Sequence, residues 1–236
     1  MKFADPVGRE PAWAAWPWTL ALLALLLAWD VGGLDLALAR TMADGNGFAL
    51  RGSWMLDVLL HDWARRAAFA TGAWLAVGIG WPTGILRRLP RPARIQWLAS
   101  LLVGVAVVNL LKHASRSSCP WDLAEFGGAA TYLSHWAWGL PDGGPGHCFP
   151  AGHASAGFAF VGGFFALRPV SPRLALACLA AAAASGLVLG VAQQLRGAHF
   201  MSHTLWTAWL CWVAASMVDA AGRFLSQPAR ESLAPR

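Results

Sequence analysis

Residues 95–111 read IQWLASLLVGVAVVNLL and contain no Asp, Glu, Lys or Arg, and Lys112 and His113 follow directly. A helix of about 20 apolar residues crosses the roughly 30 Å of hydrocarbon in a bilayer, so this run needs only a short extension to span it. Five further stretches have the same character. They cover residues 12–29, 67–86, 154–167, 174–195 and 204–218. The pattern predicts an all-α membrane bundle with six transmembrane helices.

The composition also indicates a protein that is embedded in a membrane. Of the 236 residues, 57% are hydrophobic and 13% are charged, against roughly 25% charged residues in soluble domains. A soluble globule of this size could not hide so much apolar surface. Pro17 and the lack of a small-residue cleavage pattern predict that the first run is retained as an anchor. We expect one membrane domain over residues 1–222 and a cytoplasmic tail over residues 223–236.

The distribution of charge predicts the orientation. With the N-terminus inside, the inner segments carry 11 Lys and Arg against four Asp and Glu, and the outer segments carry seven against eight. The positive-inside rule therefore places both termini in the cytoplasm. The net charge of +6 is better explained by this orientation and by anionic lipid head groups than by nucleic acid, which we do not expect as a partner. A multi-pass protein of a bacterial inner membrane is predicted.

Reactive side chains concentrate in two predicted outer segments, residues 112–153 and 196–203. Six of the seven histidines lie there, and polar groups at a membrane boundary favour a functional site. We expect His113 and His135 to be hydrated or interfacial. The other outer segment, residues 31–66, predicts short amphipathic helices that link two spans or form a lid.

Three short sequences carry a family resemblance: LKHASRSSCPW at 111–121, FPAGH at 149–153 and RGAHFMSH at 196–203. Their order and placement resemble the motifs K-x6-R-P, P-S-G-H and S-R-x5-H-x3-D of the type 2 phosphatidic acid phosphatase (PAP2) superfamily. The resemblance implies an integral membrane phosphatase that acts at the outer face on a lipid phosphate or pyrophosphate. It assigns His199 as the nucleophile that forms a phosphohistidine and His153 as the general acid, and it places His203 where the family has an orienting Asp.

Four family positions differ in this chain. Their residues are Cys119 for Arg, Ala151 for Ser, Gln193 for Arg and His203 for Asp. Arg116 lies about one helical turn from Cys119, and Arg196 about one turn from Gln193. We expect their guanidinium groups to bind phosphate in place of the two missing motif arginines. Lys112 and the backbone amides of Ala151, Gly152 and His153 complete the predicted anion site. His203 is expected to accept a hydrogen bond from His199 at i, i+4, with Asp122 or Asp142 as alternative orienting acids.

Other interpretations use the same residues. The H-x3-H spacing of His199 and His203, with Cys119 and Cys148, would suit zinc, but the general base of an HExxH site is missing. Because these thiols face an oxidising compartment, we expect a Cys119–Cys148 disulfide instead, with no metal and no cofactor. The substrates implied by the resemblance are polyprenyl pyrophosphate, lipids of the phosphatidic acid type and lipid A. A lipid-to-lipid phosphotransferase and a non-catalytic lipid-binding or assembly protein remain alternatives.

Overall fold

The computed structural model describes residues 16–225 of the chain, and within them the structure is helical, without a β-strand. The prediction of an all-α protein is confirmed. The elements are α1 (Trp16–Val31), α2 (Leu34–Arg40), the π-helix η2 (Met55–Trp63), α3 (Ala64–Val77), η3 (Gly84–Arg88), α4 (Arg91–Ala114), η4 (Pro120–Asp122), η5 (Ala124–Phe126), α5 (Ser155–Phe158), η6 (Ala159–Val161), α6 (Gly162–Leu167), α7 (Pro172–Leu195) and α8 (Met201–Leu225).

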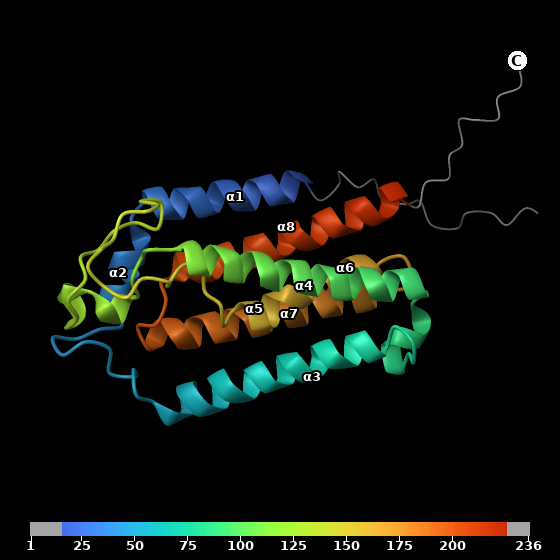
Figure 1. Ribbon diagram of the computed structural model, residues 1–236, viewed down its shortest axis with the longest axis horizontal. Helices are drawn as coiled ribbons and strands as arrows, with labels where there is room; N and C mark the ends of the chain where they lie inside the picture. Colours follow the sequence, from blue (N-terminus) through green and yellow to red (C-terminus); the bar gives the residue numbers. More distant parts are fainter. Residues whose placement is uncertain (1–15, 226–236) are drawn as a thin grey trace, which may run out of the picture.

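Six helical units in the described residues run along the long axis of the molecule, one for each predicted apolar run (Figure 1). They are α1, α3, α4, the α5–η6–α6 unit, α7 and α8. The unit at 154–167 is not a uniform helix, since a short 3-10 segment separates α5 from α6. Residues 12–15 of the first predicted run lie outside the described residues.

Length and apolar composition qualify fewer of these helices as membrane spans. Among the described residues, α4 and α7 are long and apolar enough to cross a membrane. The pair α1 and α2 would add a third span if it is one unit, although it bends by 65°. The remaining units are too short or too polar to qualify by that measure alone. The described residues thus provide two or three candidate spans, and the prediction of six transmembrane helices is not confirmed.

Small residues bring the helices close together. Helix α8 packs against α1, α4, α6 and α7, while α3 packs against α4 and α5. Gly157 in α5 faces Gly186 in α7 so closely that a Cβ on Gly157 would lie 2.3 Å from the Gly186 nitrogen. Thr204 covers Gly190 in the same way, since a Cβ added to Gly190 would lie 2.1 Å from Thr204 Cγ2. Such contacts are characteristic of helices that associate without a hydrophobic driving force between them.

The end of the bundle away from the loops is tied by one carboxylate. Asp219 of α8 accepts hydrogen bonds from Arg168 and Arg223, each at 2.7 Å, and from Gln96 at 3.0 Å. These contacts join α8 to α4 and to the end of α6. The predicted domain boundary at residue 222 lies nearby. It falls inside α8, which continues to Leu225. Residues 226–236 of the predicted tail lie outside the described residues.

The opposite end of the bundle carries the long connections (Figure 1). The segment 31–66 contains two short helices, α2 and η2, as predicted. Segment 112–153 has only the short turns η4 and η5 and lies beside α2. Because helices α4, α7 and α8 also begin or end here, this end collects side chains from distant parts of the sequence.

The close approach of α5 and α7 predicts a steric effect of one methyl group. Gly157→Ala should lower the free energy of unfolding by about 1–3 kcal/mol, because the new Cβ meets backbone that cannot turn away. Thermal unfolding of the purified protein in detergent measures it. Gly72→Ala is the matched control, since its Cβ would lie 3.5 Å from Leu101 Cδ2, an ordinary contact. Equal midpoints for the two variants would contradict the packing described.

Candidate active site

The three sequences that carried the resemblance meet at the loop end of the bundle. Lys112 lies in the last turn of α4, His153 just before α5, and His199 and His203 around the start of α8. The ring centroids of His153 and His199 are 6.3 Å apart, and those of His199 and His203 are 5.8 Å apart. Segments more than 40 residues apart in sequence thus place three imidazoles around one point.

A tight reversal of the chain positions His199. Helix α7 ends at Leu195 and α8 begins at Met201, so His199 lies in the connection between them. Gly197 turns the chain with φ 75°, a left-handed conformation that glycine adopts without strain. A Cβ at Gly197 would also lie 2.3 Å from the Phe48 ring. The connection is therefore packed beneath the 31–66 segment and leaves His199 buried.

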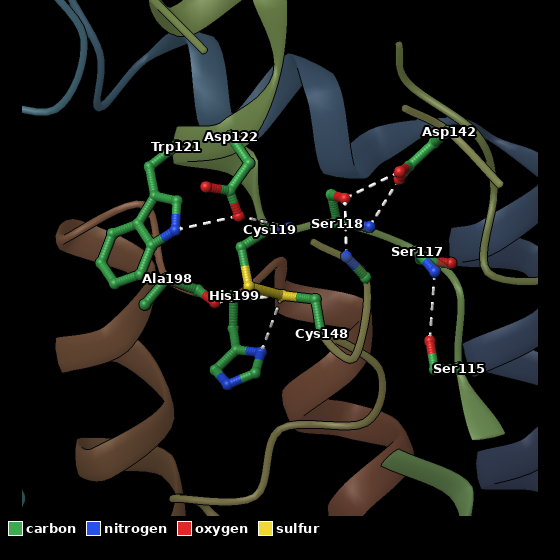
Figure 2. Close-up of a disulfide and its surroundings, with 11 residues drawn as sticks. Ser115, Ser117, Ser118, Cys119, Trp121, Asp122, Asp142, Cys148, Ala198 and His199 are labelled. Carbon is green, nitrogen blue, oxygen red and sulfur yellow. Dashed lines mark hydrogen bonds between the residues drawn. A yellow bond between two sulfur atoms is a disulfide. The ribbon is translucent and has the colours of Figure 1, made fainter. Parts of the chain in front are cut away.

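The disulfide predicted between Cys119 and Cys148 is present (Figure 2), with a Cα–Cα distance of 5.2 Å and a sequence separation of 29. It joins the first motif to the second. The sulfur atoms and the ring of His199 lie within 4.8 Å of one another. Because the sulfurs are bonded to each other, they are not the thiolates that a zinc site would use. The other two cysteines, Cys178 and Cys211, are free and lie in α7 and α8.

His199 is almost fully enclosed, with 3% of the residue's surface exposed. Its Nδ1 lies 3.4 Å from Cys148 Sγ (Figure 2). Burial, and after it the positive charge of Lys112, lowers the pKa of His199 well below its usual value of 6.5. The ring is therefore neutral near pH 7, which is the form that has a lone pair for nucleophilic attack.

His203 does not orient His199 in the expected way. The two rings meet edge to face at 66°, and no hydrogen bond joins them in the described part of the chain. The expectation of this bond is wrong because it assumed both residues on one helix, whereas α8 begins after His199. The alternative acids are engaged elsewhere. Asp122 accepts from Trp121 Nε1 and Cys119 N, and Asp142 from the amide and hydroxyl of Ser118.

The predicted cations differ in their surroundings. The Lys112 side chain passes over Gly152, where a Cβ would lie 3.4 Å from Lys112 Cδ. Arg116 is exposed, and no hydrogen bond or ion pair engages its guanidinium within residues 16–225. The guanidinium of Arg196 is enclosed, and each of its three nitrogens has a partner. It contacts Asp57 Oδ1 at 2.9 Å, Gln193 Oε1 at 3.5 Å and the carbonyl oxygen of Arg51 at 3.3 Å.

The predicted backbone site is smaller than expected. The N–H of Ala151 donates to the carbonyl oxygen of His203 at 3.2 Å and so does not face an anion. Helix α5 begins at Ser155, so the amides of residues 151–153 do not form its first turn. The main chain at Gly152, beneath the Lys112 side chain, is the part of this segment that can approach a phosphate closely.

A buried polar cluster behind the histidines was not predicted. His135 stacks on Phe149 at 4.2 Å and lies 3.3 Å from Asp30 Oδ2, so its predicted hydrated position is wrong, whereas His113 is exposed as expected. Asp30 also accepts from the indole nitrogens of Trp136 and Trp206 at 3.0 and 2.9 Å. The sequence signal for this cluster was Asp30, a carboxylate that directly follows the apolar run 12–29.

Comparison with known proteins agrees with the motifs. The family model of the PAP2 superfamily matches residues 94–221, which include all three motif segments and the helices that carry them. No curated protein and no solved structure matches the chain.

The buried neutral state of His199 predicts a pH dependence of stability. The unfolded chain takes up a proton near pH 6.5, whereas the folded state resists it, so stability falls as the pH decreases below 6.5. The slope from one such group is at most about 1.4 kcal/mol per pH unit. His199→Gln should flatten the decline of the unfolding midpoint between pH 7.5 and 5, and the exposed control His113→Gln should not. An unchanged slope in His199→Gln would show that the folded state accepts the proton.

Proposed function

Because the chain belongs to the PAP2 superfamily, we propose that it is an integral membrane phosphatase that hydrolyses a lipid phosphate or pyrophosphate through a phosphohistidine. Membership in the family supports a phosphatase-type activity on phosphate esters. The observation that carries the finer proposal is the neutral, buried His199, with the His153 ring 6.3 Å away and Lys112 alongside. A phosphorus atom between these rings would meet a nucleophile on one side and a proton donor on the other.

The proposed reaction has two displacements. The Nε2 lone pair of His199 attacks phosphorus, the bond from phosphorus to the lipid oxygen breaks, and protonated His153 gives that oxygen its proton. Neutral His153 then takes a proton from water as the water oxygen attacks the phosphohistidine. Inorganic phosphate leaves and His199 is restored. Lys112 and Arg116 offset the charge on the equatorial oxygens in both steps.

The side surface of the bundle supports a membrane location. Large apolar side chains are exposed around it, among them Leu25 at 69%, Phe69 at 73% and Leu110 at 70%. In water each such side chain would forgo about 1.5–3 kcal/mol of burial, whereas lipid tails cover it at no such cost. We propose six membrane spans in a bacterial inner membrane, with both termini cytoplasmic and the histidines at the periplasmic end.

This location favours a substrate anchored in the outer leaflet. A phosphate carried at the head-group level reaches the loop end of the bundle without leaving its membrane. The candidates are polyprenyl pyrophosphate, phosphatidic acid and the phosphates of lipid A. Transfer of the phosphoryl group to a lipid alcohol instead of water would make the protein a lipid phosphotransferase.

Phosphate release from a lipid panel tests the proposal. The purified protein should release phosphate from at least one of the three candidates, and His199→Ala should lower the rate by about 10³-fold or more, as loss of a nucleophile does. His113→Ala, in an exposed position, serves as the control. Phosphate that appears on a lipid alcohol would indicate transfer. A lack of turnover with every lipid would favour a non-catalytic lipid-binding protein, and release that persists in His199→Ala would reject His199 as the nucleophile.

The contacts of Arg196 predict that Asp57 and the substrate phosphate compete for its guanidinium. If Arg196 binds phosphate, it must exchange Asp57 for the substrate, and the 53% exposure of the Asp57 side chain leaves room for that movement. Asp57→Asn should then lower KM several-fold, while Arg116→Ala should raise it, because an exposed guanidinium is lost. Steady-state kinetics on the preferred lipid measure both. An unchanged KM in Asp57→Asn would assign Arg196 to holding η2 instead of phosphate.

A further inference from the structure

The group that faces Nδ1 of His199 is a sulfur atom of the disulfide. Cys148 Sγ lies 3.4 Å from Nδ1 and 3.2 Å from the carbonyl oxygen of Ala198. Cys148 is fully buried, so water does not compete for this contact. The position that a carboxylate holds in the family's third motif is occupied by His203, which forms no hydrogen bond with His199 among the described residues. Within residues 16–225, therefore, no carboxylate is hydrogen-bonded to the His199 ring.

In this contact the sulfur can only accept a hydrogen bond, and the ring nitrogen must donate it. A disulfide sulfur carries no hydrogen, and it accepts hydrogen bonds weakly. The contact is attractive when Nδ1 of His199 carries the proton, and the neutral ring then has its lone pair on Nε2. Since the partner of one ring nitrogen sets the tautomer of a histidine, the sulfur contact favours the form that can attack phosphorus through Nε2. The backbone of Cys148 also hydrogen-bonds the imidazole, so both groups of Cys148 act on this ring.

We propose that Cys148, fixed by its bond to Cys119, is the positioning residue of His199: it holds the Nδ1–H tautomer and the ring orientation where the family pattern has a carboxylate. This inference rests on the proposed function for the role of Nε2, but the tautomer itself does not depend on turnover. It adds a role to a cross-link that would otherwise serve only to close a loop.

The surroundings of the disulfide fit a positioning role. The Cys148 amide donates to the Ser117 carbonyl at 2.9 Å, and the Trp121 amide donates to the Gly197 carbonyl at 2.9 Å. The loop that carries Cys148 and the loop that carries His199 are thus each hydrogen-bonded to the same segment, residues 117–121. The bond to Cys119 also prevents the Cys148 side chain from rotating away. A free thiol at 148 could turn and would carry a hydrogen of its own.

The first experiment reads the tautomer directly. Nitrogen-15 spectra of histidine-labelled protein distinguish Nδ1–H from Nε2–H rings, and the His199 signal is assigned by its loss in His199→Gln. The wild-type signal should report the Nδ1–H form, and the double variant Cys119→Ala/Cys148→Ala should show a mixture. An Nε2–H ring in the wild type would overturn the proposal, whether or not the protein releases phosphate.

The second experiment separates positioning from cross-linking. Cys119→Ala/Cys148→Ala and Cys119→Ala/Cys148→Ser both lack the disulfide, so their unfolding midpoints should fall equally. Only the serine variant keeps an acceptor at 148. With phosphatidic acid micelles, or the panel lipid with the highest rate, kcat should fall about 10²-fold in the alanine variant with little change in KM, as for a misplaced reactive group.

The serine variant should recover part of this loss in kcat. Equal kcat values for the two variants would assign the disulfide to stability alone and overturn the positioning role. If no lipid in the panel is hydrolysed by the wild type, the proposed function fails, and the tautomer measurement alone decides this inference.

Discussion

The site depends on the exclusion of water from the imidazole of His199. A histidine on an exposed loop would be partly protonated near neutral pH and free to rotate. Here the turn at Gly197 places the ring beneath the 31–66 segment, and the disulfide covers Nδ1. Burial lowers the pKa of the ring and the sulfur limits its orientation. Packing by the surrounding loops therefore prepares the imidazole of His199 for the nucleophilic role proposed for it.

The helix bundle fixes the distances between the reactive side chains at the loop end. Helix α4 brings Lys112 to the loop end, and α8 starts next to His199, so the length of each apolar helix fixes where its reactive end lies. Close glycine contacts such as Gly157 with Gly186 hold the helices near one another. At the far end, Asp219 ties α8 to Arg168. A shift of one helix along its axis would separate the rings of His153 and His199.

Much of this arrangement could be predicted from the sequence, because apolar runs and motif order are local properties. The six helical units and the convergence of the three motifs follow from them. The disulfide apart, individual contacts between side chains of distant segments could not be predicted. The ion pair of Arg196 with Asp57 spans 139 positions, and neither residue signals the other. The position of His199 was also missed, because its spacing from His203 suggested a shared helix while Gly197 delays the start of α8.

Three of the four departures from the family motifs, at Cys119, Gln193 and His203, replace charged residues and can be considered together. The family pattern sets one Lys and two Arg against one Asp, which is a net charge of +2 beside the phosphate. Under the proposed function, Lys112 and Arg116 also provide +2 in this chain, because Asp57 pairs with Arg196 and His203 replaces the carboxylate with a neutral ring. Retaining the Asp would have lowered the net charge of the proposed anion site to +1 and weakened its attraction for phosphate. The disulfide then supplies orientation without charge, which a carboxylate could not do.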